Sequence, residues 1–108
     1  MSTKDLVAKL PDLSLASIDS IHQITAYLIS QEGVSGIWLF GSLAKGRQPD
    51  WRSDIDVAVR GLAASKLGGV WSELDARIPQ SLDLVRWEDA SDLLKREIVH
   101  WGKLLYAT

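Results

Sequence analysis

The chain has 108 residues, and its 12 basic and 14 acidic side chains give a formal net charge of −2. This length is typical of one domain, so we predict a single domain over residues 1–108. The mildly acidic balance argues against direct nucleic-acid binding, and the absence of cysteine excludes disulfides, a thiol nucleophile and cysteine-ligated zinc. The polar N-terminus and the lack of an apolar run of roughly 20 residues predict a soluble, cytoplasmic protein without a membrane partner.

Apolar residues at helical spacing predict three amphipathic helices, at residues 15–31, 63–77 and 89–101. The second contains Gly68 and Gly69, which disfavour a helix by roughly 1 kcal/mol each relative to alanine. In the third, spacing predicts that Leu94, Ile98 and Trp101 form the buried side.

Four short segments read as strands: 36–40, 54–59, 81–86 and an edge strand at 103–106. A short helical turn is predicted between the first two, at 43–46. Helix, strand, strand, helix, strand, helix is an α/β (α+β) order, and we expect one sheet with flanking helices.

Three carboxylates within these strands, Asp54, Asp56 and Asp83, indicate chemistry because aspartate is disfavoured in strands. Residues i and i+2 of a strand share a face, and an aspartate of a neighbouring strand could complete a cluster. Oxygen ligands suit Mg²⁺ or Mn²⁺, and two such ions would support phosphoryl or nucleotidyl transfer. The alternative is that Asp54 begins a strand, Asp56 faces solvent and Asp83 is incidental.

Gly41 and Ser42 follow the first strand and open a helical turn, a combination that suits a bound phosphate. Lys45, Arg47 and Arg52 could add positive charge beside that phosphate, and their position favours this role over the alternative of a solvated loop. A phosphate cradle on one strand and a carboxylate pair on the next together favour nucleotidyl transfer.

The segments 41–46 and 53–59 resemble the Gly-Ser…Asp-x-Asp signature of the polymerase-beta-like nucleotidyltransferases, in particular their minimal (MNT) branch. The similarity extends over roughly residues 18 to 106. Two features depart from many members of the branch: the loop from Leu43 to Ser53 is longer, and Arg86 occupies the position of a second acidic residue.

The resemblance implies a mixed sheet with flanking helices, with ATP as substrate and Mg²⁺ or Mn²⁺ as cofactor. It places the triphosphate at Gly41 and Ser42, and we assign Lys45 and Arg52 to nucleotide binding. Asp54, Asp56 and Asp83 would be the catalytic residues and would ligate the metals, and Asp83 would also help to activate the attacking hydroxyl.

Members of the MNT branch also imply a partner, a helical HEPN-type protein that is often an RNase toxin. The resemblance predicts an antitoxin that transfers AMP from ATP to a tyrosine of that toxin. One alternative is a non-catalytic nucleotide-binding subunit that neutralises or assists the HEPN protein by steric binding. Another is a small-molecule nucleotidyltransferase, although a chain of this length has few residues from which to form a pocket for the acceptor.

Five tryptophans are many for this length. Trp38, Trp71 and Trp101 are predicted to be core residues, whereas Trp87 indicates nothing. Trp51, in the polar loop, is equally consistent with packing and with stacking on a base or a partner.

Overall fold

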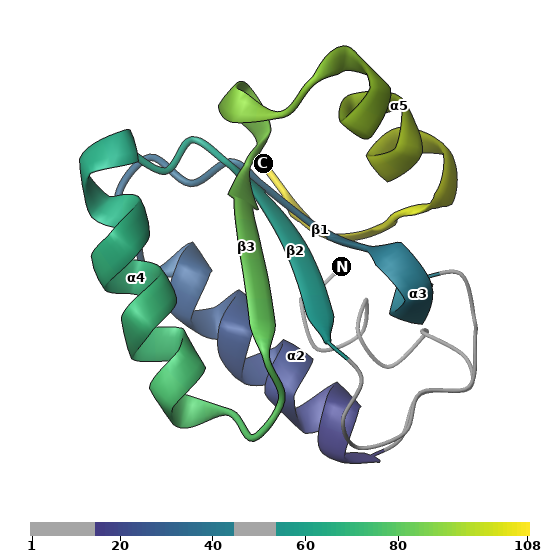
Figure 1. Ribbon diagram of the computed structural model, residues 1–108. Coiled ribbons are helices and arrows are strands. Elements are labelled where there is room, and N and C mark those ends of the chain that lie inside the picture. The colour runs from purple at the N-terminus through teal and green to yellow at the C-terminus, as the bar shows by residue number, and fades with distance from the viewer. Residues whose placement is uncertain (1–14, 45–53) are drawn as a thin grey trace.

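A computed structural model of the protein describes residues 15–44 and 54–108 (Figure 1). Its centre is a four-stranded sheet in the order β3-β2-β1-β4. Strand β1 (Gly36–Phe40) pairs antiparallel with β2 (Ile55–Arg60) and with β4 (Lys103–Ala107). Strand β3 (Leu82–Arg86) pairs parallel with β2, so the sheet is mixed, as expected.

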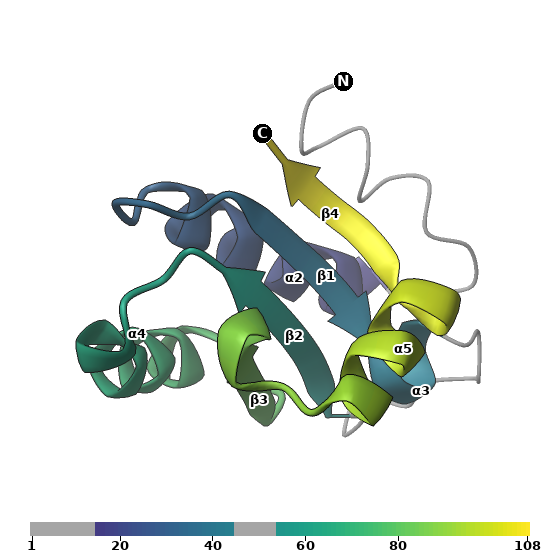
Figure 2. The same ribbon diagram turned by 90° about the horizontal axis from the view of Figure 1, so that it is seen from above.

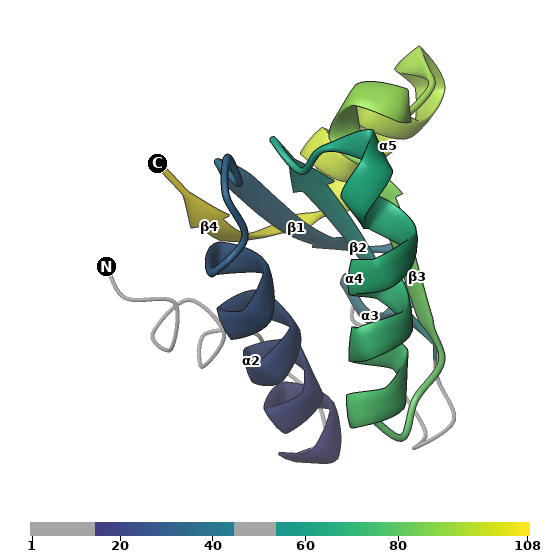
Figure 3. The same cartoon turned by 90° about the vertical axis from the view of Figure 1, so that its left-hand side faces the viewer.

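Helices cover both faces of the sheet (Figures 2 and 3). Helices α2 (Leu15–Ile29) and α4 (Ala64–Arg77) lie on one face, and α5 (Asp92–Trp101) lies on the other. A parallel strand pair needs a crossover connection, and α4 provides it between β2 and β3. The short α3 (Gly41–Ala44) follows β1 without a break.

Two apolar cores result from this arrangement. The larger core lies between the sheet and helices α2 and α4, and the alternating Ile55, Val57 and Val59 of β2 point into it. The smaller core lies under α5 and contains Phe40, Ala58 and Ile98. Because strand side chains alternate, the residues of β2 between the three core residues face α5.

The predicted helices and strands are confirmed, with boundaries that differ by a few residues. The last helix begins at Asp92 and not at residue 89, because Trp87–Asp89 forms a separate 3₁₀ turn, η1. The Arg86 side chain stabilises this turn by donating hydrogen bonds to Asp89 Oδ1 at 2.9 Å and Oδ2 at 2.8 Å. Ser91 then caps α5, accepting a bond from the Leu94 amide at 3.1 Å.

The tryptophan predictions are confirmed at two positions and wrong at the third. Trp38 and Trp71 pack against the two cores, and the Trp71 indole donates to the Leu82 carbonyl at 2.8 Å. Trp101, the last residue of α5, is 52% exposed and is not among the side chains that pack against the small core. Trp51 lies outside the described residues.

We expect Gly68→Ala and Gly69→Ala each to stabilise the protein by about 0.5–1 kcal/mol. Both residues are exposed within α4, and an added Cβ at either position meets nothing within 4 Å. Alanine therefore removes backbone freedom from the unfolded chain without a steric cost in the folded one. Urea unfolding of the two variants measures the gain, and a loss of stability in both would contradict this account of α4.

No helix among the described residues is long and apolar enough to cross a lipid bilayer. The single-domain organisation over residues 1–108 stays a prediction.

Candidate active site

The junction of β1 and α3 brings Gly41 against the side chain of Asp56. Gly41 has φ +75°, a left-handed conformation that favours glycine. A Cβ at this position would collide with the Asp56 carboxylate oxygen Oδ2 and would lie 3.0 Å from Cγ. The glycine of the Gly-Ser pair is therefore required both by its backbone conformation and by the carboxylate beside it.

Asp56 lies at the centre of three adjacent strands. In the sheet register it is opposite Phe40 of β1 and opposite Asp83 of β3. Its neighbours Ile55 and Val57 are buried in the large core, so Asp56 projects toward α5. Strand pairing thus brings together the second and third predicted carboxylates, which are 27 positions apart in the sequence.

Asp54 differs from the expectation in one respect. It precedes β2, which begins at Ile55, and it is exposed. Asp83 is also exposed, whereas Asp56 is half-buried. The candidate site is therefore open to solvent, and Asp56 is the one of the three aspartates that is partly buried.

Burial and neighbouring negative charge raise the pKa of Asp56 to about 6. Burial is the largest cause, followed by the charges of Asp83, Asp54 and Glu97. Three other carboxylates are thus close enough to disfavour the ionised form of this one. A cation at the site would relieve the repulsion between them.

Glu97 is the member of this group that the sequence did not reveal. It lies on α5, next to Ile98 of the small core. The helix itself was predicted, but the pattern did not indicate which face of the sheet it covers. Once the topology is known, the position of Glu97 next to the inward-facing Ile98 identifies it as a member of this group.

The donor chemistry of these carboxylates fits a hard divalent cation. Among residues 15–44 and 54–108, no three acidic or histidine side chains are already arranged to hold an ion, so binding would have to draw them together. Of the predicted nucleotide-binding residues, Gly41 adjoins the carboxylates and Ser42 is exposed at the start of α3. Lys45 and Arg52 lie outside the described residues.

Asp56→Asn should stabilise the protein near neutral pH but not in acid. The pKa of Asp56 rises from an ordinary value of 3.8 to about 6 on folding. Between these values the folded protein binds more protons than the unfolded chain, so Asp56 lowers stability as the pH rises through this window. The amide does not titrate, and we expect a gain of about 1–2 kcal/mol above pH ~7, after allowance for solvent screening of a half-exposed group.

Urea unfolding at three pH values, from about 4 to about 7.5, checks this prediction. The gain should be absent at the lowest value and complete at the highest. An equal gain at all three would mean that the amide acts through packing and not through the lost charge.

A mixed sheet with a glycine-serine turn against a strand aspartate is the arrangement of a nucleotidyltransferase domain, and the family comparison agrees. Residues 22–108 match the family described as Polymerase beta, Nucleotidyltransferase. This match covers most of the chain, and the protein belongs to this family.

Individual relatives place the chain near one group within the family. It is 39% identical over 77 residues to the protein adenylyltransferase MntA of Shewanella oneidensis, a match that covers 67% of this chain. The matched region is 53% of that relative, so the chain spans about half its length.

Two solved structures support the same grouping. One is a toxin-antitoxin structure with AMP-PNP, with a TM-score of 0.67 and 30% identity, covering 83% of this chain and 73% of that chain. The other is a tri-AMPylated Shewanella oneidensis HEPN toxin in complex with an MNT antitoxin. It gives a TM-score of 0.68 at 26% identity and covers 87% of this chain and 74% of that chain.

Proposed function

We propose that the protein is the antitoxin of a toxin–antitoxin pair and transfers AMP from ATP to a tyrosine of a HEPN-type toxin. The observation that carries the proposal is the contact of Gly41 with Asp56 in a group of four carboxylates. Similarity to an adenylyltransferase, to a structure with AMP-PNP and to an AMPylated toxin complex supports this choice of reaction and partner.

The roles of the residues follow from the reaction. The acceptor hydroxyl oxygen attacks the α-phosphorus of ATP, a new O–P bond forms, and the bond to pyrophosphate breaks. Gly41 lets the triphosphate approach the backbone at the start of α3, and the Ser42 hydroxyl donates to a phosphate oxygen. Lys45 and Arg52 would contribute positive charge to the same phosphates.

The carboxylates divide into a binding set and a base. Asp54 and Asp56 would hold Mg²⁺ or Mn²⁺, with Asp83 beside them, and the ion would supply charge neutralisation at the phosphates. Asp83 would accept the proton of the attacking hydroxyl, and its exposure and its place opposite Asp56 in the sheet support this role.

The test uses the purified chain, its cognate HEPN-type protein, ATP and Mg²⁺, with intact mass as the readout. We expect the partner to gain one or more AMP units, and peptide mapping to place them on tyrosine. Asp56→Asn should lower the rate roughly 1,000-fold, because it removes a ligand of the metal. Asp75→Asn, an exposed aspartate of α4, is the matched control and should leave the rate unchanged.

A second candidate function is steric neutralisation without catalysis, and exposed apolar residues of α5 favour a binding role. The two functions give different results in the same experiment. A stable complex without any mass gain would contradict AMP transfer and support steric binding. A mass gain that survives Asp56→Asn would contradict the assigned site.

A further inference from the structure

The outward side of α5 exposes more apolar surface than a helix packed on a sheet needs. Leu94 and Ile98 face the small core. On the other sides of the same helix, Leu93 is 76% exposed and Val99 is 69% exposed. Val99 lines one hollow together with Trp87, and Leu93 lines another together with Trp101, which is 52% exposed; apolar residues grouped in this way are typical of interaction sites.

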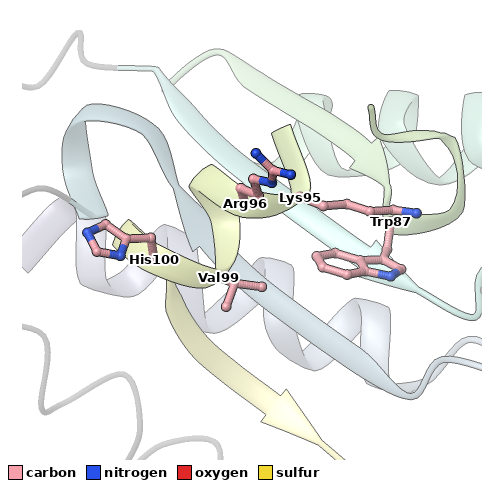
Figure 4. Close-up of a pocket in the computed structure, with 5 residues that line it drawn as sticks. All are labelled: Trp87, Lys95, Arg96, Val99 and His100. Atoms are coloured by element: carbon pink, nitrogen blue, oxygen red, sulfur yellow. The ribbon is translucent and has the colours of Figure 1, made fainter. Parts of the chain in front are cut away.

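Two hollows flank the outward ridge of α5 formed by Arg96 and His100. The first has a volume of about 690 Å³ and is shown in Figure 4. The second, on the other side of the ridge, has a volume of about 400 Å³ and includes Leu93, Glu97 and Trp101. The first hollow is lined by Trp87, Lys95, Arg96, Val99 and His100. We refer to both hollows and their ridge as the α5 surface.

The wall of the first hollow is held in place by stacked side chains. The Trp87 ring stacks on Trp38, with ring centroids 5.0 Å apart, and Lys95 Nζ lies 5.5 Å from the Trp87 ring centroid. The guanidinium carbon Cζ of Arg60 lies over the Trp38 ring, 5.4 Å from the ring centroid. Because these rings are already held in place, little side-chain entropy would be lost when an apolar side chain of a partner binds against them.

The charge of the first hollow is opposite to that of the chain as a whole. Its lining includes Lys95, Arg96 and His100 and, among the described residues, no acidic side chain. The whole chain carries a net charge of −2. The hollow therefore favours a negatively charged occupant.

The mixture of apolar and basic residues favours a protein over a nucleic acid. Binding of nucleic acid rests on many phosphate contacts, and within the part of the chain that the structure describes the hollow offers two permanent cations, Lys95 and Arg96. Val99 and Trp87 instead suit an aliphatic or aromatic side chain.

The α5 surface is continuous with the carboxylate site. Glu97 lines the second hollow, and α5 contacts α3, the helix that begins at Gly41 beside Asp56. A protein bound on the outward side of α5 would therefore lie beside the carboxylates, at the place where a modified residue must arrive.

We propose that the α5 surface is the docking surface for an acidic amphipathic segment of the partner protein. An apolar side chain of that segment fills the hollow between Trp87 and Val99, and its carboxylates pair with Lys95 and Arg96. The identity of the partner rests on the proposed function; the location of the surface does not depend on AMP transfer.

The experiment measures the dissociation constant of the chain with its cognate HEPN-type protein at two salt concentrations. We expect Val99→Asp, and separately Lys95→Glu with Arg96→Glu, to raise the dissociation constant at least tenfold. The wild-type complex should weaken as salt rises. Matched controls on the exposed side of α4, Ser72→Asp and Lys66→Glu, should change it less than twofold. Circular dichroism verifies that each variant is folded.

The outcomes separate this inference from the proposed function. Asp56→Asn should lose AMP transfer and keep binding, which would support a separate docking surface. Unchanged affinity in all α5 variants would overturn the docking surface while AMP transfer stands. Failure of the wild-type chain both to bind and to modify the HEPN-type protein would overturn the proposed partner and this inference with it. Binding of a labelled RNA oligonucleotide through Lys95 and Arg96, in place of the protein, would also overturn it.

Discussion

Gly41→Ala is expected to lower the rate of AMP transfer at least 100-fold and to destabilise the fold by about 2 kcal/mol. The loss of stability comes from the φ of +75° and from the new Cβ, which collides with the Asp56 carboxylate. The loss of rate has a different origin. Relief of the collision displaces the Asp56 carboxylate, and under the proposed function a small displacement of a metal-binding group has a large effect on the rate.

The measurement combines a time course of AMP incorporation, read by intact mass, with urea unfolding of the same preparation. Ser42→Ala, the adjacent substitution, should lower the rate of AMP transfer only about tenfold, because it removes one hydrogen-bond donor and leaves Asp56 in place. A Gly41→Ala variant that is folded and fully active would show that Asp56 tolerates displacement, and would remove the contact on which the proposed function rests.

The regular elements could be predicted from the sequence because their periodicities are local. The alternation of Ile55, Val57 and Val59 predicts the inner face of β2, and Val70 and Leu74 predict the buried side of α4 despite its two glycines. Helix α4 forms because packing of that buried side outweighs the propensity of Gly68 and Gly69.

The start of α5 could not be predicted, because long-range contacts determine it. Arg86 bonds to the Leu62 carbonyl at 2.8 Å as well as to Asp89, and these contacts divide the segment into the η1 turn and α5. Trp87 was uninformative in the sequence for the same reason. Its role becomes visible only through the stacked Trp38 of another strand.

The candidate site was predictable in part. The Gly-Ser pair and the aspartates were recognisable, since each stands out within an apolar segment. That Asp56 and Asp83 lie opposite each other depends on the parallel pairing of β2 with β3, which no local pattern specifies. The position of Glu97 depends in turn on α5 covering the face opposite α2 and α4.

Gly61→Ala is expected to destabilise the protein by roughly 3 kcal/mol while leaving the carboxylates of the candidate site in place. Gly61 has φ +94° in the turn after β2, and a Cβ there would collide with the Gly33 carbonyl oxygen and lie 3.2 Å from the Ser35 amide nitrogen. Both neighbours are backbone atoms, so neither can rotate away, and Ser35 is itself bonded to the Arg60 carbonyl at 2.9 Å. The turn before β1 and the turn after β2 must therefore separate.

This substitution is also the control that gives Gly41→Ala its meaning. Both glycines have a positive φ, and at both a Cβ would collide with neighbouring atoms, but of the two only Gly41 contacts Asp56. With the fraction of folded protein measured by circular dichroism, Gly61→Ala should show the wild-type rate per folded molecule and a midpoint of thermal unfolding lower by about 10 °C or more. If Gly61→Ala instead lost rate as severely as Gly41→Ala, general loosening of the fold would explain both results. A normal rate per folded molecule would confine the effect of Gly41 to the carboxylate beside it.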